Sequence, residues 1–216
     1  MRTPDSEGAK TRLIKGLPKE NVARLYEAFV QDTLEKLDAL SCDVKVISYL
    51  GESPSRDFFH SKIGEVKFLP QQGATLGERL KNYFVWSFSD GAAKSIVIGS
   101  DSPTLPMSYL REAFALLDLY EVVIGPSLDG GYYLLGMKEF HPELFDNIPW
   151  GEEEVFQKTI LQNRHLEGRI GLLGPWYDVD TPEALSLLKE HLEEMSRNAE
   201  EELPRRTYRV LSELEG

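Results

Sequence analysis

The sequence predicts an α/β domain whose sheet is mostly parallel. Short apolar strands alternate along the chain with amphipathic helices, an order that favours parallel strands joined by helical crossovers. Two of the strands, 95–99 and 121–125, are continuous apolar runs typical of strands buried on both faces of a parallel sheet. The 216 residues show no internal repeat and no linker-like segment, so we expect a single domain over 1–216.

Hydrophobic periodicity predicts the individual elements. Apolar residues every three or four positions predict helices, and short β-rich or apolar runs bounded by glycine, proline or polar residues predict strands. The predicted order is a helix at 19–40, strands at 44–50 and 66–69, a helix from 76 to 88, a strand at 95–99, a helix at 107–118, strands at 121–125 and 132–137, a helix at 152–161, a strand at 170–173, and C-terminal helices within 183–216 broken at Pro204.

Local signals support the helix boundaries. Pro18 lies near the start of the first helix, where its missing N–H costs least. The acids 152–154 begin the helix at 152–161, and negative charge is favourable at a helix N-terminus. Thr181-Pro182-Glu183 has the form of an N-cap followed by proline at the first helical position, which predicts where the C-terminal helices begin.

Composition excludes several classes of protein. With 36 acidic against 24 basic side chains, the formal charge of -12 repels a phosphate backbone, so we expect no nucleic-acid partner. Cys42 is the single cysteine, which rules out an internal disulfide and favours a reducing cytoplasm. No apolar run approaches the ~18 residues of a membrane span, and residues 1–5 lack the apolar region of a signal peptide. Nothing in the sequence predicts the oligomeric state.

Three loops that carry aspartates come after three of the predicted strands. They are Ser100–Pro103, Pro126–Gly131 and Tyr177–Thr181. Ligands of parallel α/β sheets bind beyond the carboxyl ends of the strands, so we expect a binding site there. A further candidate is Gly8-Ala9-Lys10-Thr11-Arg12, whose cations and flexible glycine could hold a diphosphate, although a solvated basic turn is equally consistent with these residues. Their spacing is not that of a P-loop.

Each candidate also has a structural interpretation. Asp101 directly follows a buried-type strand and is a natural Mg²⁺ or Mn²⁺ ligand, or it caps a turn. Taken alone, Asp180 is better explained as a helix N-cap than as a metal ligand. The segment Asp129–Tyr133 could let a ligand approach its glycines and stack on its rings, but a tight turn into a strand is the simpler interpretation. The four histidines show no metal-ligand spacing and are expected to be surface or packing residues.

An ordered set of motifs resembles one family over nearly the whole chain. The set, rather than any single motif, is specific. It comprises Gly8-Ala9-Lys10-Thr11-Arg12-Leu13, Gln31-Asp32-Thr33, Leu76-Gly77-Glu78-Arg79-Leu80, Ile98-Gly99-Ser100-Asp101-Ser102-Pro103, Gly125-Pro126, Asp129 to Gly136, Pro149-Trp150 and Asp178-Val179-Asp180-Thr181-Pro182. The chain resembles the DUF2064 family of glycosyltransferase-A-like transferases, which is also labelled as radical-SAM- or selenodomain-associated transferases or as arsenosugar-biosynthesis glycosyltransferases.

The resemblance implies a fold and a set of roles. The fold is the Rossmann-like nucleotide-diphospho-sugar transferase (GT-A) fold, with helices on both faces of the sheet, which cofactor nucleotidyltransferases share. The implied donor-binding residues are Gly8, Lys10 and Arg12 at the phosphates and Leu76 and Gly77 near the base. The implied metal ligands for Mg²⁺ or Mn²⁺ are Asp101 and, as a second ligand, Asp180. The implied sugar or acceptor side comprises Asp129, Gly130, Gly131, Tyr132 and Trp150.

The implied reaction is metal-dependent transfer of a sugar from a nucleotide-diphospho-sugar to a small-molecule acceptor. The metal, Lys10 and Arg12 would stabilise the leaving diphosphate, and Asp129 would orient or deprotonate an acceptor hydroxyl. Two alternatives remain open, a nucleotidyltransferase that joins an NTP to a phosphorylated acceptor and a non-catalytic nucleotide-binding module. Family members have an apolar strand before the stretch matched by Arg2-Thr3-Pro4, where this chain has Met1, so we expect the true start to lie upstream.

Overall fold

The computed structural model describes residues 17–51, 65–166 and 168–215. Over these residues the chain forms two compact units. The sheet unit comprises Gln71–Gly99 and Ser108–Tyr177, and the helical unit comprises the described residues up to Pro70, Ser100–Met107 and the residues from Asp178 on. The order of helices and strands matches the order predicted from the sequence, with ends that differ by a few residues.

The sheet unit is built on a four-stranded sheet. Its strands, in spatial order, are β3 (Ser95–Ile98), β5 (Tyr132–Met137), β4 (Val122–Pro126) and β6 (Ile170–Leu172). Strand β4 runs parallel to β6, whereas β5 runs antiparallel to both β3 and β4. The loop between β4 and β5 is only 127–131, which is too short for a helical crossover and therefore joins antiparallel strands. Strands β3, β4 and β6 point the same way, so their carboxyl ends lie at one edge.

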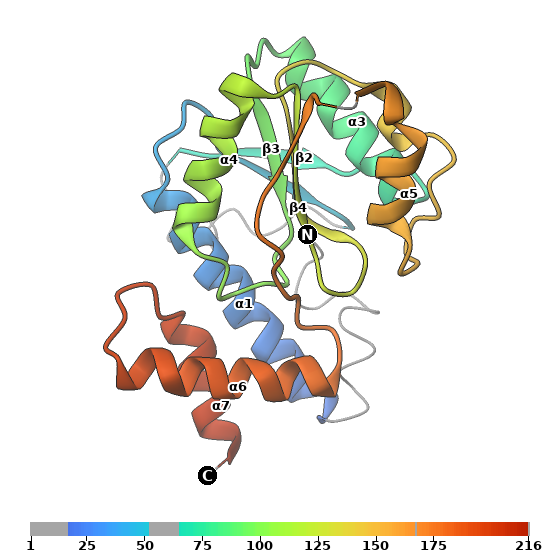
Figure 1. Cartoon of the computed structure of the whole chain (residues 1–216). Helices are drawn as coiled ribbons and strands as arrows, with labels where there is room; N and C mark the ends of the chain where they lie inside the picture. Colours follow the sequence, from blue (N-terminus) through green and yellow to red (C-terminus); the bar gives the residue numbers. More distant parts are fainter. Residues whose placement is uncertain (1–16, 52–64, 167, 216) are drawn as a thin grey trace. The chain divides into compact units, whose positions relative to one another are not determined.

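Helices cover both faces of this sheet, as the α/β class requires. Figure 1 shows α4 (Met107–Leu119) along one face, and α3 (Leu76–Ser89) and α5 (Val155–Gln162) along the other. On the α3 face, Val122 and Ile124 of β4 share a buried cluster with Phe84 of α3. On the α4 face, a side chain added at Gly136 of β5 would contact Leu117. The two central strands, β4 and β5, are therefore buried on both faces, whereas the outer strands β3 and β6 are only partly buried.

The sheet unit also contains two short 3-10 helices, and its helix α5 (Val155–Gln162) begins later than expected. The short helices are η2 (Pro142–Phe145) and η3 (Arg164–Leu166). Helix α5 was expected to begin at residue 152 but begins at Val155, because residues 151–154 form turns. The three acids 152–154 therefore precede the helix, where they still lie close to its positive end.

The helical unit contains a small parallel sheet and three helices. Strand β1 (Val46–Tyr49) pairs in parallel with β2 (Lys67–Pro70). The helices are α1 (Lys19–Ala39), α6 (Pro182–Arg197) and α7 (Arg205–Glu215), and α7 packs against α1 (Figure 1). Helix α1 starts directly after Pro18 as expected and buries an apolar stripe that includes Leu25 and Phe29.

Asp32 on α1 holds the start of α7. Its carboxylate accepts hydrogen bonds from the backbone amides of Arg206 (3.2 Å) and Thr207 (2.8 Å) and from the Thr207 hydroxyl (2.6 Å). Its side chain is only 2% exposed, and this burial raises the pKa of the carboxyl even though the hydrogen bonds oppose the shift. A negative group at a helix N-terminus is favourable, so this part of the Gln31-Asp32-Thr33 motif has a structural role.

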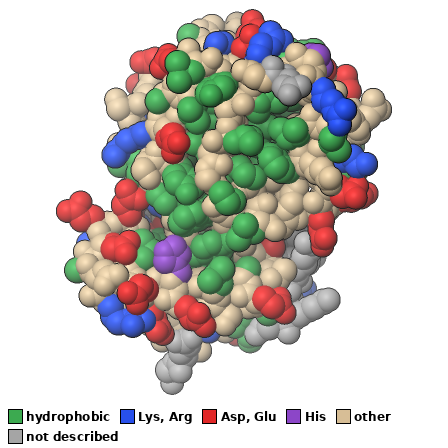
Figure 2. Space-filling view, viewed as in Figure 1, with side chains coloured by type: hydrophobic (Ala, Val, Ile, Leu, Met, Phe, Trp, Pro, Cys, Tyr) green, Lys and Arg blue, Asp and Glu red, His purple; other side chains and the backbone are tan. Residues whose placement is uncertain are grey.

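The surface is consistent with the acidic composition. Figure 2 shows acidic side chains spread over the part of the surface formed by the C-terminal helices. Among the helices of the described residues, none is long and apolar enough to cross a membrane.

Candidate functional site

The predicted site residues fall into three groups. Gly8, Lys10 and Arg12 lie outside the described residues. The aspartate pair, Asp101 and Asp180, belongs to the helical unit. The remaining predicted residues belong to the sheet unit; they are Leu76, Gly77, Asp129, Gly130, Gly131, Tyr132 and Trp150.

The aspartate pair lies on two hydrogen-bonded backbone segments. The amide of Val179 donates to the carbonyl oxygen of Asp101 over 2.9 Å, so Asp180 is the next residue after a direct partner of Asp101. Val179 is fully buried, whereas Asp101 and Asp180 are both half-buried. Two carboxylates on adjacent segments provide the hard oxygen donors that Mg²⁺ and Mn²⁺ prefer, so the chemistry of these residues fits the expected metal.

Asp180 is not the N-cap of α6, and the interpretation favoured for this residue alone was wrong. Thr181 is the N-cap, with an extended backbone and a side-chain oxygen that accepts from the amide of Ala184 over 3.2 Å. Pro182 occupies the first turn, as the Thr181-Pro182-Glu183 pattern predicted. Because Thr181 already caps the helix, the carboxylate of Asp180 is not needed for that purpose.

A half-buried lysine supports the loop after Asp101. Lys36 of α1 donates from Nζ to the backbone carbonyls of Pro103 and Leu105, the latter over 2.7 Å. Burial lowers the pKa of Lys36 to about 8, against the opposing influence of Glu202 and Asp32. Hydrophobic periodicity did not identify Lys36 as a functional candidate, because the residue lies outside the apolar stripe of its helix. The only available signal in the sequence was its position four residues after Asp32, on the same helix face.

The segment after β4 forms the tight turn that was the simpler interpretation of its sequence. The Ser127 amide donates to the Gly131 carbonyl (3.0 Å), and the Gly131 amide donates to Asp129 Oδ1 (3.0 Å). Gly130 has a φ of +91°, and a Cβ there would overlap the carbonyl of Glu153. Only glycine satisfies both conditions, and the turn fixes the orientation of the Asp129 carboxylate.

Aromatic contacts bring together three of the predicted residues of the sheet unit. The rings of Tyr132 and Trp150 meet edge to face at 5.9 Å between centroids. A Cβ at residue 77 would overlap the Trp150 indole, so glycine permits this close approach to the first turn of α3. Burial raises the pKa of the Tyr132 phenol, and a hydrogen bond with Thr159 only partly offsets that effect. Tyr132 therefore stays neutral and acts as a packing and hydrogen-bonding group.

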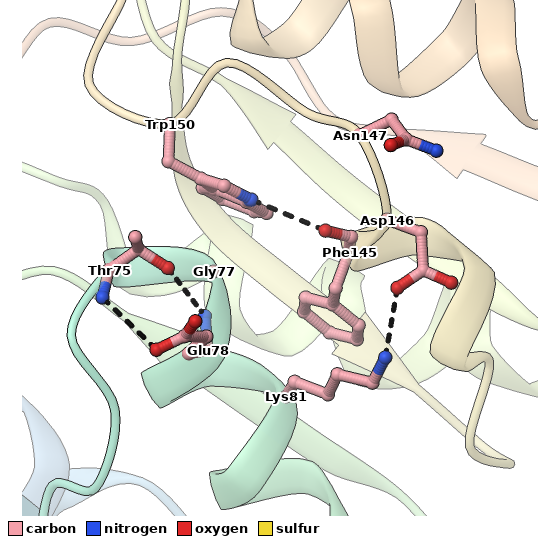
Figure 3. A pocket seen from close by; sticks show the side chains of 8 residues that line it. All are labelled: Thr75, Gly77, Glu78, Lys81, Phe145, Asp146, Asn147 and Trp150. Carbon is pink, nitrogen blue, oxygen red and sulfur yellow. Dashed lines mark hydrogen bonds and ion pairs between the residues drawn. The ribbon is translucent and has the colours of Figure 1, made fainter.

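A pocket of about 460 Å³ opens between the start of α3 and the segment from η2 to Trp150 (Figure 3). Its lining residues are Thr75, Gly77, Glu78, Lys81, Phe145, Asp146, Asn147 and Trp150. Its volume lies within the range typical of small-molecule sites. Of the two residues that the family resemblance implied near the donor's base, Gly77 lines the pocket, whereas Leu76 is half exposed and does not.

The pocket walls are held by local hydrogen bonds and one ion pair. Thr75 and Glu78 form a reciprocal capping box at the start of α3. Lys81 pairs with Asp146 at 2.9 Å, and the Trp150 indole N–H donates to the Phe145 carbonyl over 3.4 Å (Figure 3). Nothing in the sequence motifs pointed to Lys81, Asp146 or Asn147. The available signal for Lys81 is its position four residues after Gly77, on the same helix face.

Comparisons with known proteins agree with the fold described above. The family model described as "Uncharacterized protein conserved in bacteria (DUF2064)" matches residues 33–152. The crystal structure of a "putative nucleotide-diphospho-sugar transferase" from Desulfovibrio desulfuricans G20 is 36% identical, with a TM-score of 0.85; the match covers 99% of this chain and 91% of that chain. A search of curated proteins found no match.

A more distant structure shares the fold alone. CMP:2-keto-3-deoxy-manno-octonic acid synthetase in complex with CTP is 11% identical, with a TM-score of 0.50 over 77% of this chain and 88% of that chain. These similarities confirm the nucleotide-diphospho-sugar transferase fold that the motifs implied. Because the family model matches more than half of the residues and a relative is 36% identical over 99% of them, the chain belongs to the DUF2064 family.

Proposed function

We propose that this protein is a metal-dependent glycosyltransferase that moves a sugar from a nucleotide-diphospho-sugar to a small-molecule acceptor. The observation that carries the proposal is the 36% identity, over 99% of the chain, to a protein described as a putative nucleotide-diphospho-sugar transferase. The chemistry of the described residues supports it, because they include hard oxygen ligands, a pocket with aromatic walls and an oriented carboxylate.

The aspartate pair is the proposed metal site. Asp101 and Asp180 would hold Mg²⁺ or Mn²⁺ through carboxylate oxygens. The bound cation would offset the negative charge that develops on the leaving diphosphate. Lys36 supports this role by fixing the carbonyls of Pro103 and Leu105, which keeps the loop after Asp101 in one conformation.

The pocket at the start of α3 is the proposed position of the donor's base. Trp150 and Phe145 offer apolar rings for stacking, and Asn147 offers an amide that can both donate and accept hydrogen bonds. Gly77 leaves room for the Trp150 indole against the first turn of α3, which fixes that ring in the pocket wall. Lys10 and Arg12 are the proposed partners of the donor's phosphates.

Asp129 is the proposed acceptor-side group. Its Oδ1 accepts a hydrogen bond from the Gly131 amide. Oδ2 accepts none from the described residues, so it is the oxygen proposed to meet an acceptor hydroxyl. As the bond between the sugar's anomeric carbon and the diphosphate oxygen breaks, the acceptor oxygen would form the new bond to that carbon. The hydroxyl proton would pass to Asp129 Oδ2.

The test is ligand-dependent thermal stability combined with label transfer. The full chain is melted with a panel of nucleotide sugars and NTPs, with and without Mn²⁺, and is then supplied with sugar-labelled donor or α-labelled NTP. We expect one nucleotide sugar to stabilise the protein only with Mn²⁺ and to deliver its sugar label to product. Asp101→Asn should lose the effect. Asp118→Asn, which changes an exposed carboxylate paired with Lys94, should retain it.

Two outcomes would overturn the proposal. Stabilisation by NTPs alone, with transfer of α-label, would identify a nucleotidyltransferase. Binding of a nucleotide without turnover, at an affinity that Asp101→Asn leaves unchanged, would identify a non-catalytic nucleotide-binding module.

A further inference from the structure

We propose that Glu121, Glu139 and His141 form a binding site for a transition-metal dication of the zinc type. This histidine–glutamate cluster lies where β4 begins and β5 has ended, at the opposite end of the hairpin from the turn 127–131. The two segments are joined there by a hydrogen bond from the amide of Lys138 to the carbonyl of Glu121, over 3.1 Å. The cluster is thus made of different residues, at a different edge of the sheet, from the proposed acceptor side.

The spacing of the ligand atoms matches metal coordination better than hydrogen bonding. His141 Nε2 is 3.4 Å from Glu121 Oε2 and 3.6 Å from Glu139 Oε1, and the three atoms lie within 4.8 Å of one another. Zinc bonds of ~2.0–2.2 Å place tetrahedral ligand atoms roughly 3.3–3.6 Å apart. A good N–H···O hydrogen bond would instead be about 2.9 Å long.

The histidine is buried and directed into the cluster. Its side chain is 9% exposed, so more than nine-tenths of it is buried. Nε2 of His141 and Oε2 of Glu121 are both inaccessible to solvent, and neither atom has a hydrogen-bond partner within the described ranges. A buried polar atom without a hydrogen-bond partner lowers the stability of the fold, and a shared cation would satisfy both atoms at once.

Neighbouring residues orient two of the three ligands. His141 Nδ1 is 3.1 Å from Glu143 Oε1, an acceptor that holds the proton on Nδ1 and directs the lone pair of Nε2 into the cluster. This carboxylate–histidine arrangement is common behind metal-binding imidazoles. Glu121 Oε1 accepts from Arg169 over 2.9 Å, which leaves Oε2 for the metal. The Glu139 side chain is 62% exposed and offers a path of entry.

The donor set favours zinc over magnesium. One imidazole nitrogen and two carboxylate oxygens suit Zn²⁺ and its neighbours in the first transition series, whereas Mg²⁺ prefers oxygen alone. Water would complete a four-coordinate sphere. The competing arrangement is a protonated His141 held by the surrounding glutamates, which needs a proton on Nε2 in place of a metal.

A zinc titration of the full chain distinguishes the two arrangements. Long-range ¹H–¹⁵N spectra of the imidazoles are recorded while Zn²⁺ is added, and affinity is measured against a chromophoric zinc indicator. We expect the His141 Nε2 resonance to move on binding while Nδ1 stays protonated. The unfolding temperature should rise by about 5–10 °C when free Zn²⁺ is near 100 times Kd.

Matched variants assign the binding to these residues. Glu139→Gln, at an exposed position, should weaken zinc binding at least tenfold. Asp118→Asn, also an exposed carboxylate of the sheet unit, and Asp101→Asn should leave the His141 response unchanged. Equal zinc affinity in wild type and Glu139→Gln would overturn the proposal. A His141 ring with both nitrogens protonated at saturating Zn²⁺ would also overturn it, and neither result depends on the transfer reaction.

Discussion

The aspartate pair and the histidine–glutamate cluster share one pattern of backbone hydrogen bonding. In the first, the amide of Val179 donates to the carbonyl of Asp101, and the next residue is Asp180. In the second, the amide of Lys138 donates to the carbonyl of Glu121, and the next residue is Glu139. In each case one hydrogen bond joins two segments that each carry a carboxylate, and in the second case the ligand atoms of Glu121, Glu139 and His141 lie within 4.8 Å of one another.

The two sites differ in the residues that come after the second carboxylate. After Asp180 come Thr181, the N-cap of α6, and then the helix itself, so the aspartate pair offers oxygen donors only. After Glu139 the chain continues to a buried His141, which adds a nitrogen donor. The same backbone contact thus yields a site suited to Mg²⁺ or Mn²⁺ in one place and a site suited to zinc in the other.

The largest expected effect comes from breaking the aspartate pair. Asp101→Asn keeps the carbonyl that accepts from Val179 but removes the charged ligand. We expect the rate of sugar transfer to fall by about 10²–10⁴-fold, because charge stabilisation of the leaving group would be lost. Initial rates at saturating Mn²⁺, with Asp118→Asn as control, measure the change. A rate within twofold of wild type would show that Asp101 is not a metal ligand of the reaction.

The two members of the aspartate pair became candidates in different ways. Asp101 directly follows a buried strand, so its position alone marked it as a possible metal ligand. Position alone favoured Asp180 as a helix cap, and only the family resemblance made it a possible second ligand. Hydrophobic periodicity located the helices and strands, because each of them buries an apolar stripe or face. The antiparallel direction of β5 was not predicted, although the short loop 127–131 carried that information.

The histidine–glutamate cluster could not be predicted in the same way. Glu121 and Glu139 are brought together by the pairing of β4 with β5, so their separation in sequence depends on the length of that hairpin rather than on a ligand motif. His141 was expected to be a surface or packing residue. It is buried, and only the three-dimensional structure shows which of its nitrogens faces the glutamates.

The second effect concerns the lysine that supports the aspartate pair. Burial favours the neutral amine of Lys36, so between pH 8 and its ordinary pKa of 10.5 the unfolded chain binds more protons than the folded chain. Stability must then rise with pH across that window. Relative to Lys36→Met, we expect the free energy of unfolding of wild type to increase by about 2–3 kcal/mol from pH 7.5 to 10.5.

Urea unfolding at several pH values measures this difference, because groups common to both proteins cancel. Parallel pH profiles for wild type and Lys36→Met would contradict the buried state of the amine. They would also remove the argument that a cation fixes the loop after Asp101.

A third, smaller effect tests the support of the histidine–glutamate cluster. Glu143→Gln keeps an oxygen that can accept from His141 Nδ1 but removes its negative charge, which lowers the basicity of Nε2. We expect zinc affinity to fall roughly tenfold. His165→Gln is the control, because His165 also contacts Glu143 Oε1, at 3.2 Å, but lies outside the set of ligands. If both variants weakened binding equally, Glu143 would act on the local structure rather than on His141.

The smallest effect separates Asp180 from the helix that begins beside it. Thr181→Ala removes the side chain that accepts from Ala184 and should cost about 1 kcal/mol of unfolding free energy. Asp180→Asn should change stability by less than about 0.5 kcal/mol, since Thr181 already caps the helix. Denaturant unfolding measures both values, and Mn²⁺ affinity provides the second readout. If Asp180→Asn cost as much stability as Thr181→Ala while Mn²⁺ affinity stayed constant, Asp180 would be a structural residue, and the two clusters would no longer be parallel cases of paired carboxylate ligands.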